Sequence, residues 1–341
     1  MHAMHSFAEK FLPKTDLYAA QITDGMQGIF AIRDEAYGGF RSSDGFELIK
    51  YFGKDEVLEL PEWVTVVRPE AFEGSRVREI ILPPSMRAIP DCMFLACRSE
   101  ISITLPESVE HIGAWAFADC ALEGVFIPDS VTSIGKSAFR FCSLPEKVRL
   151  PETLTELPED AFSGSDVRDI YIPDSVTVLG ALIFEGCRQL EKVRLPETLT
   201  ELPEEAFSQS GLKEISIPDP VAIIGKRAFA DCYDELKKVR LPASLIEIGD
   251  EAFNLSFIEN IEIPATVKRI GKGAFRGTNL TEIILPDGLE SIGERAFPDG
   301  LKSVNIPDSV IYIGCGAFDG NALVSEAVRG KILAINSEAL R

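Results

Sequence analysis

One phrase recurs along the whole chain and constrains its fold more than any other feature. In each copy a proline is followed by a phenylalanine eleven residues later, as in IPDSVTSIGKSAF at 127–139 and LPDGLESIGERAF at 285–297. Successive prolines lie 21 to 24 residues apart, so all variation in repeat length falls between a phenylalanine and the next proline. A repeat of this length is typical of a solenoid, in which each coil packs only on its neighbours.

The repeat has twelve copies, and the spacing between its proline and its phenylalanine is the same in all of them. The prolines are Pro61, Pro83, Pro106, Pro128, Pro151, Pro173, Pro196, Pro218, Pro242, Pro264, Pro286 and Pro307. The phenylalanines are Phe72, Phe94, Phe117, Phe139, Phe162, Phe184, Phe207, Phe229, Phe253, Phe275, Phe297 and Phe318. The stretch VRLPETLTELPEDAF at 148–162 returns almost unchanged at 193–207, which indicates duplication of a two-coil unit.

Each coil divides into three parts. A short alternating segment such as LKEISIP precedes the proline and predicts a strand, which the proline ends because it cannot donate to a sheet. A glycine or proline then marks a turn, as at Gly113, Gly135, Pro158 and Gly180. The following Ala-Phe-x-x-Cys/Ser predicts one short helical or 3₁₀ turn facing the axis. Stacking would place the phenylalanines in one buried ladder, each contributing roughly 1.5–3 kcal/mol.

The phrases IPDSVTSIGKSAFRFC and LPESVEHIGAWAFADC resemble the BspA-like (treponemal-type) leucine-rich repeat family. The resemblance covers residues 46–321, about twelve coils of 22–23 residues. It implies a leucine-rich-repeat solenoid with a parallel sheet on one face, short helical or 3₁₀ turns on the other, and capped ends. Members of this family are often bacterial surface proteins that bind host or matrix proteins. The family has no shared catalytic residues to carry over.

The segments outside the repeat predict caps, because open solenoid ends need covering. Residues 1–45 are predicted to form an N-terminal cap, and residues 44–72 a hairpin that leads into the first coil. Residues 322–341 have helical periodicity at Leu323, Ala327, Val328 and Ile332, which predicts a C-terminal helical cap. The leucine-rich repeat solenoid itself is expected at 46–321.

The charge of the chain excludes some partners. A formal net charge of -20 and a pI near 4.7 disfavour nucleic acid and acidic membrane surfaces. No run of 18 apolar residues exists, so no membrane insertion is expected. The first residues do not have the pattern of a secretory signal. Two locations remain open: the cytoplasm if the chain is complete, and the cell surface or secretion if a signal was removed. The sequence does not indicate an oligomeric state.

The cysteines and histidines predict structure rather than chemistry. Cys97, Cys120, Cys142, Cys187 and Cys232 each lie three residues after a repeat phenylalanine, where five other coils have serine or threonine. A position that accepts either residue is a small buried slot, so no metal site and no cofactor are expected, although a disulfide between consecutive coils stays conceivable. The chain has three histidines, His2, His5 and His111, and no nucleophile–base pair can be assembled from them. We therefore expect no enzyme activity.

The face of the predicted sheet is the candidate binding surface. Residues two and four before each proline should point outward. The two-before row includes Phe126, Arg149, Tyr171, Arg194 and Arg240, which are of the types enriched at interaction hot spots. A basic strip of this kind on an acidic protein could receive an acidic segment of a partner.

A structural interpretation of the same face competes with the functional one. Lys147, Asp169, Lys192, Glu214 and Lys238 alternate in sign along the four-before row, so they could simply pair across adjacent strands. The residue after each proline is usually acidic and is expected to be solvated or to serve the turn. The sequence thus favours a non-enzymatic module that binds another protein, with a secreted or surface adhesin as the alternative.

Overall fold

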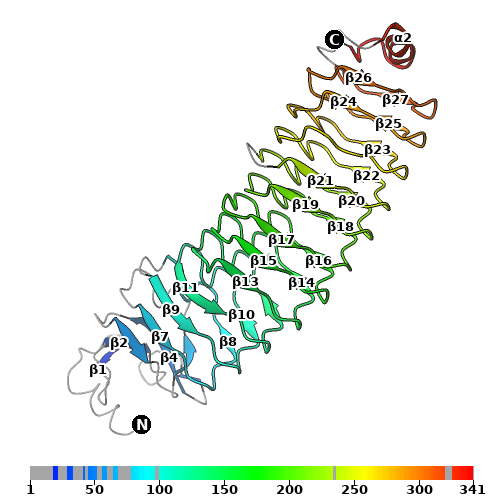
Figure 1. Cartoon of the computed structure of the whole chain (residues 1–341). Helices are drawn as coiled ribbons and strands as arrows, with labels where there is room; N and C mark the ends of the chain where they lie inside the picture. The colour runs from blue at the N-terminus through cyan, green and yellow to red at the C-terminus, as the bar shows by residue number, and fades with distance from the viewer. Residues whose placement is uncertain are drawn as a thin grey trace. The chain divides into compact units, whose positions relative to one another are not determined.

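A computed structural model describes residues 56–59, 78–96, 100–232, 236–318 and 325–340, together with strands at 18–21, 29–33, 41–42, 45–51 and 64–67. Two compact units make up the chain, residues 1–154 and residues 155–341. Within each unit the repeats form stacked coils (Figure 1). The solenoid of parallel strands predicted from the repeat is confirmed.

Two rows of strands run through each unit. The first row has one strand just before each repeat proline except Pro264; in the first unit these strands are β5 (Val57–Glu59), β7 (Glu79–Ile81), β9 (Glu100–Thr104), β11 (Ala121–Phe126) and β13 (Lys147–Arg149). In the second unit they are β15 (Asp169–Tyr171), β17 (Lys192–Arg194), β19 (Glu214–Ser216), β21 (Lys238–Arg240), β24 (Glu282–Ile283) and β26 (Ser303–Val304). Within each unit, paired strands of this row are parallel, as Glu79 opposite Ser102 and Asp169 opposite Lys192 illustrate, and the register shifts once, between β9 and β11.

The second row lies after the prolines and was not predicted. It consists of β8 (Ala88–Ile89), β10 (His111–Ile112) and β12 (Ser133–Ile134) in the first unit. In the second unit it consists of β14 (Glu156–Leu157), β16 (Val178–Leu179), β18 (Glu201–Leu202), β20 (Ile223–Ile224), β22 (Glu247–Ile248), β23 (Arg269–Ile270), β25 (Ser291–Ile292) and β27 (Tyr312–Ile313). Two residues are too few to show alternation in a sequence, and these strands form only because neighbouring coils pair them.

A tight turn separates the two rows. At each of the eleven described repeat prolines, Pro83 to Pro307, the proline carbonyl accepts a hydrogen bond from the N–H three residues later. The serine or threonine within this turn bonds to the coil before it, as when Ser130 Oγ donates to the Val109 carbonyl at 2.7 Å. The proline therefore ends the first-row strand, as predicted, and also begins the turn to the second-row strand, which was not predicted.

The segment around each phenylalanine differs in detail from the expected helical or 3₁₀ turn. It consists of turns closed by i to i−3 hydrogen bonds, and no 3₁₀ helix occurs in the residues that the structure describes. Every described residue with positive φ lies two positions before or after a repeat phenylalanine, as Leu182 (φ 61°) and Gly186 (φ 69°) do. These left-handed residues prevent a continuous helix from forming and turn alternate N–H groups toward the next coil. Phe184 N–H, for example, donates to Ala206 C=O at 2.9 Å.

The core of each unit is a ladder of phenylalanine rings. In the first unit Phe94, Phe117 and Phe139 are fully buried, with ring centroids 5.2 and 5.4 Å apart. In the second unit the ladder runs from Phe162 to Phe318, with centroids 5.0 to 6.0 Å apart and the rings stacked. Such ring pairs add roughly 0.5–1.5 kcal/mol each beyond burial. The predicted ladder is confirmed over these residues, while Phe72 lies outside the described residues.

The N-terminal strands do not follow the repeat. β1 (Tyr18–Gln21), β2 (Ile29–Arg33), β4 (Gly45–Tyr51) and β3 (Arg41–Ser42) pair in that order, antiparallel. The hairpin expected within residues 44–72 is wrong, because β6 (Val64–Val67) pairs with β4 in parallel. The hairpin of this region lies one strand earlier, between β3 and β4. The assignment of residues 1–45 as a cap stays a prediction.

At the other end, helix α2 (Glu326–Ile335) follows the last coil, with Ser325 as its N-cap. Ile332 is buried, as the helical pattern predicts, but Val328 is only partly buried and Ala327 is exposed; Leu323 lies outside the described residues. After the helix, Ala339 C=O accepts from Phe318 N–H at 2.9 Å, the bond that the next coil would otherwise supply. These contacts support our proposal that residues 322–341 cap the solenoid.

Candidate interaction surface

The outward row of the first-row strands carries the candidate binding residues. Phe126 is 61% exposed and Arg149 is also exposed, and both belong to the first unit. Tyr171 (36% exposed), Arg194 and Arg240 belong to the second unit. The residues one and three before a proline are buried in most coils, as Ile170 and Ile172 are, so the predicted alternation holds there. The exceptions among the described residues are Val193, Val239, Ile261 and Ile263, which are partly exposed.

Tyr171 and Arg194 form one rigid pair on adjacent strands. They lie directly opposite each other on β15 and β17, and the Arg194 guanidinium carbon lies 4.8 Å from the centroid of the Tyr171 ring. Arg194 also donates to Asp174 Oδ2 at 2.7 Å and to the Ile172 carbonyl at 3.1 Å. A cation stacked on an aromatic ring and fixed by two hydrogen bonds loses little side-chain entropy on binding.

Asp174 forms an ion pair with Arg194. The hydrogen bond from Arg194, and then that from the Glu197 N–H at 2.8 Å, lower the pKa of the Asp174 carboxyl. The same Asp174 hydrogen bond raises the pKa of Arg194. Both groups are therefore charged at neutral pH, and the ion pair presents a flat Tyr–Arg surface edged by one carboxylate.

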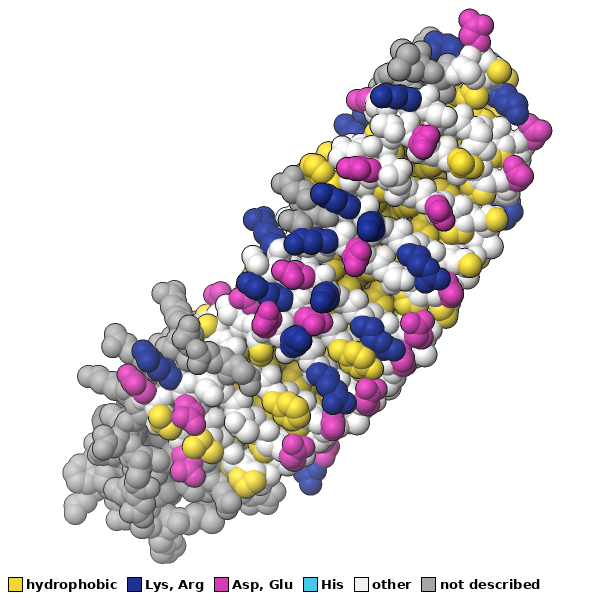
Figure 2. Space-filling model, in the orientation of Figure 1, with side chains coloured by type: hydrophobic (Ala, Val, Ile, Leu, Met, Phe, Trp, Pro, Cys, Tyr) yellow, Lys and Arg dark blue, Asp and Glu magenta, His cyan; other side chains and the backbone are white. Residues whose placement is uncertain are grey.

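Arg240 repeats the arrangement two coils later, more loosely. Its guanidinium lies 3.7 Å from Asp219, which occupies the same position after a proline as Asp174, and 3.2 Å from Ser216 Oγ. Asp169 lies opposite Lys192 and Glu214 opposite Lys238 in the strand register. Figure 2 shows basic and acidic side chains interspersed over β15 to β21. The alternating charges therefore lie opposite one another across adjacent strands, and the ion pairs of this face join Arg194 and Arg240 to Asp174 and Asp219 of the acidic row.

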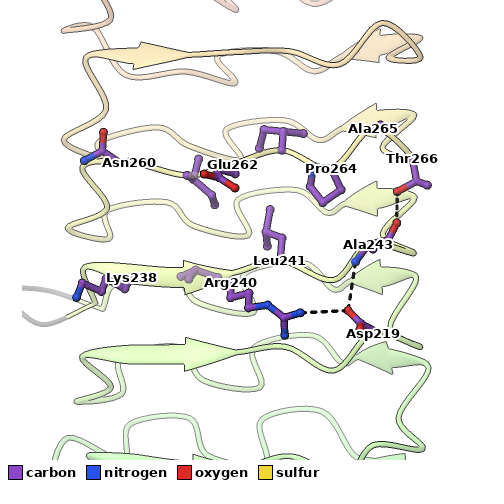
Figure 3. A pocket seen from close by; sticks show the side chains of 13 residues that line it. Asp219, Lys238, Arg240, Leu241, Ala243, Asn260, Glu262, Pro264, Ala265 and Thr266 are labelled. Carbon is purple, nitrogen blue, oxygen red and sulfur yellow. Dashed lines mark hydrogen bonds and ion pairs between the residues drawn. The ribbon is translucent and has the colours of Figure 1, made fainter.

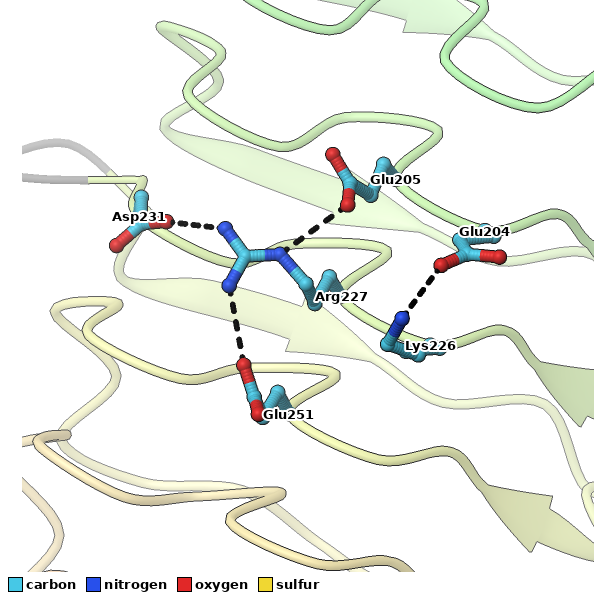
Figure 4. A network of polar contacts seen from close by, with 6 residues as sticks. All are labelled: Glu204, Glu205, Lys226, Arg227, Asp231 and Glu251. Carbon is cyan, nitrogen blue, oxygen red and sulfur yellow. Dashed lines mark hydrogen bonds and ion pairs between the residues drawn. The ribbon is translucent and has the colours of Figure 1, made fainter.

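A second polar cluster lies on the turn side of the second unit, where sequence reasoning did not place one. Arg227 contacts Asp231 at 2.7 Å, Glu251 at 3.0 Å and Glu205 at 3.3 Å (Figure 4). Partial burial lowers the pKa of Arg227, but the Glu251 hydrogen bond and the neighbouring carboxylates raise it overall. Glu205, Arg227 and Glu251 share one repeat position, two before a phenylalanine, so aligning the repeats would have revealed the Glu-Arg-Glu column.

The cysteines occupy buried slots, as predicted. Cys187 Sγ donates to the Phe162 carbonyl at 3.0 Å and Cys232 Sγ to the Phe207 carbonyl at 3.2 Å, each in the preceding coil. Burial raises the pKa of the Cys187 thiol to about 12 and that of Cys232 to about 11. Cys120 and Cys142 bond to the preceding phenylalanine carbonyls in the same way, while Cys97 lies outside the described residues.

The remaining predicted positions are peripheral. His111 is exposed on β10, with Nδ1 2.8 Å from Ser133 Oγ of the next coil, and His2 and His5 lie outside the described residues. In the part of the chain that the structure describes, no three His, Cys, Asp or Glu side chains gather as a metal site would need. Within that same part, no helix has the length and apolar character required to cross a membrane.

Comparison with known proteins relates the chain to one repeat family. The model of the BspA type leucine rich repeat region matches residues 65–191, 112–234, 182–300 and 268–341, which together span 65–341. No protein with a curated description matches the sequence.

The solved structures show the same fold. A leucine-rich repeat protein from Bacteroides ovatus is 24% identical, with a TM-score of 0.59 over 97% of this chain and 98% of the other. The pneumococcal vaccine antigen PcpA is 19% identical, with a TM-score of 0.54 over 94% and 97%. A leucine rich cell surface protein from Faecalibacterium prausnitzii is 20% identical, with a TM-score of 0.50 over 90% and 81%.

Proposed function

Because the chain belongs to the family of BspA-type leucine-rich repeat proteins, we propose that it is a non-enzymatic module that binds another protein. The proposed contact residues are Phe126, Arg149, Tyr171, Arg194 and Arg240. The Tyr171–Arg194 stack is the observation that carries the proposal, because exposed aromatic and arginine side chains held in one geometry are the usual anchors of protein interfaces. An extended row of strands presents such anchors at regular intervals.

The structural role of the charges does not exclude this function. Arg194 uses Asp174 and Ile172 to hold its position, yet the side chains of Tyr171 and Arg194 both stay partly exposed. Acidic groups of the partner would meet the exposed Arg149 in the first unit and the exposed Arg240 in the second. Binding would then bury the aromatic ring, while the charges set orientation and rate of association.

The test is capture of partners by the immobilised full chain. The double variant Tyr171→Ala/Arg194→Ala should lose at least about tenfold in affinity for a captured protein, because hot-spot truncations cost roughly 2 kcal/mol or more. Thermal unfolding should change little, because both side chains lie at the surface. The matched control is Tyr312→Ala/Arg269→Ala, which removes an exposed tyrosine and an exposed arginine from the second-row strands β27 and β23.

Two results would count against the proposal. If both double variants lost the same affinity, the binding site would lie elsewhere than on the first-row face, either on the loops after the phenylalanines or on the turn side. If no protein bound the chain saturably and the purified chain turned over a substrate, the proposal of a non-enzymatic binding module would be contradicted.

A secreted or cell-surface adhesin is the second candidate, and the family resemblance motivates it. It differs from the first candidate in location rather than in chemistry. The gene sequence upstream of Met1 tests it: an in-frame signal peptide supports an adhesin, and a stop codon directly before Met1 contradicts it.

A further inference from the structure

The second row of strands presents an outward face of its own in the second unit. In β14, β16, β18, β20 and β22 the second residue of each strand is buried and the first points outward. The outward residues are, in chain order, Glu156, Val178, Glu201, Ile223 and Glu247. We call these five residues the second-row face. Acidic and apolar side chains therefore alternate along it from coil to coil.

The apolar members of the second-row face are open to solvent. Val178 is 53% exposed and Ile223 is 40% exposed. Ile246, the residue before Glu247, is 48% exposed, and its N–H donates to the Ala222 carbonyl at 2.8 Å, which places it beside the coil of Ile223. Apolar side chains grouped on one face are a common feature of interaction surfaces.

The carboxylates of the second-row face determine which charge a partner must carry. Glu156 and Glu201 are exposed, and within the described ranges neither forms an ion pair. Glu247, at the end of the face, is paired with Arg269 of the next coil. The face is therefore apolar and acidic, and a partner with apolar and basic residues complements it.

The first-row face of the same unit lacks this imbalance. Arg240 is directed at Asp219, 3.7 Å away (Figure 3). Lys238, on the same strand, lies opposite Glu214 in the register of β19 and β21. Because cations and acids balance each other there, an excess of one charge beside exposed apolar side chains distinguishes the second-row face.

The spacing of the coils determines which conformation of a partner fits. Neighbouring rings of the ladder between Phe162 and Phe253 lie 5.3 to 5.7 Å apart, including the Phe184–Phe207 pair between the coils of β16 and β18. Since neighbouring strands lie about 4.8 Å apart, two coils advance by roughly 10–11 Å. Seven residues of an α-helix advance by about 10.5 Å. In an extended segment, residues on one side recur at about 6.6 Å and about 13 Å, which match this period poorly.

We propose that the second-row face binds an amphipathic α-helix of a partner protein, laid along the stacked coils. Lysine or arginine at every seventh position of the helix lies beside Glu156, Glu201 and Glu247. A leucine three positions after a basic residue is on the same side of the helix and lies beside Val178 or Ile223. The inference goes beyond the proposed function, because this face shares no residue with the contact residues proposed above.

The probe is the rhodamine-labelled peptide KAALQAAKAALQAAK, titrated with the full chain and followed by fluorescence anisotropy. Saturable binding is expected, together with a helical circular dichroism signal that exceeds the sum of the separate components. The peptide KAALPAAKAALPAAK keeps every lysine and leucine but cannot form a continuous helix, so it should bind at least about tenfold more weakly.

Charge reversal at the centre of the face tests the basic positions. Glu201→Lys should weaken binding of KAALQAAKAALQAAK at least about tenfold, because it places like charges together. The peptide KAALQAAEAALQAAK, with glutamate in place of the central lysine, should bind this variant better than it binds the unmodified chain. The matched control, Glu282→Lys, makes the same change in net charge on the first-row strand β24 and should change each affinity by less than about twofold.

The apolar positions are tested separately. Val178→Thr/Ile223→Thr keeps two β-branched side chains in the strands and should weaken binding at least about fivefold, because the leucines lose their apolar contacts. The control is Ile284→Thr, which changes a residue that is 79% exposed on the first row and should leave the affinity unchanged. Tyr171→Ala/Arg194→Ala should also keep full peptide affinity, so failure of the proposed function and failure of this inference are separable.

Three results would each overturn the inference. They are no saturable binding of KAALQAAKAALQAAK up to about 1 mM, the weak end of specific association; equal affinity for the proline-containing peptide; and equal effects of Glu201→Lys and Glu282→Lys.

Discussion

In the described coils, the cysteine, serine or threonine three residues after a repeat phenylalanine lies in a buried slot, where it needs a hydrogen-bond partner. A cysteine there reaches the phenylalanine carbonyl of the preceding coil, as Cys187 does with Phe162. The shorter hydroxyls of Ser256 and Thr278 bond instead to the carbonyls of their own coil, at Phe253 and Phe275, both at 2.8 Å. Cysteine and serine interchange along the repeat because either residue satisfies a buried carbonyl.

The buried thiol of Cys187 predicts a loss of stability at alkaline pH. Its pKa rises from an ordinary 9.0 to about 12 in the folded chain. Below about pH 9 both states keep the proton and stability is complete; above it the unfolded chain deprotonates first, so the free energy of unfolding falls by up to about 1.4 kcal/mol per pH unit. Urea unfolding between pH 8 and pH 10.5 should show a shallower decline for Cys187→Ser than for the unmodified chain. Cys315→Ser, which changes an exposed thiol, is the control, and equal slopes for the two variants would contradict the assignment.

The phenylalanine ladder predicts a large cost for a single truncation. Phe184 is fully buried, and its ring centroid lies 5.7 Å from that of Phe162 and 5.5 Å from that of Phe207. Phe184→Ala should lower the free energy of unfolding by about 3–5 kcal/mol, because it leaves a cavity and breaks two ring contacts. Phe126→Ala removes an exposed ring and should cost less than about 0.5 kcal/mol. Similar costs in chemical denaturation would show that the ladder is not the core of the second unit.

At the scale of the element, the turn segment is defined by close approach of successive coils. The glycine of the Ile-Gly landmark has no positive φ at Gly225, so conformational freedom does not explain it. A Cβ atom there would lie 2.6 Å from the Pro203 carbonyl carbon, 2.7 Å from the Leu202 oxygen and 2.8 Å from the Glu204 nitrogen. At Gly225 the backbone of the preceding coil therefore occupies the space that a side chain would need.

Gly225→Ala should therefore destabilise the chain by about 1–3 kcal/mol, the usual cost of overpacking. Gly330→Ala is the matched control, because a Cβ at Gly330 meets no atom within 4 Å and the residue lies in helix α2. Alanine there should stabilise the helix by up to about 1 kcal/mol. Thermal or urea unfolding measures both effects, and a neutral Gly225→Ala would show that the coils can separate at no cost.

At the scale of the whole molecule, the dominant electrostatic feature is the net charge of -20. Self-repulsion of such a charge opposes the compact state. Local ion pairs such as Lys226–Glu204 and Lys272–Glu294 are exposed, and each contributes little. We therefore expect that added salt stabilises the folded chain more by screening the long-range repulsion than it destabilises it by weakening these ion pairs.

The melting temperature should therefore rise as NaCl increases from about 0.02 M to about 0.3 M, where the Debye length falls below about 10 Å. The variant Glu107→Gln/Glu152→Gln/Glu197→Gln removes three charges from the acidic row and should show a smaller salt response. Differential scanning calorimetry measures both. A melting temperature that falls with salt would mean that ion pairs, and not net charge, dominate the electrostatics.

The sequence alone determined the coil, its register and its buried ladder, because a fixed Pro-to-Phe spacing gives equivalent residues equivalent environments in every stacked coil. It also determined which side of each first-row strand faces outward, since alternation is local. Only the tertiary structure decided the features that arise between coils. These are the two-residue strands of the second row, the Asp174–Arg194–Tyr171 cluster and the Glu-Arg-Glu contacts of Arg227. Each depends on the distance between neighbouring coils, and a pattern within one coil carries no information about that distance.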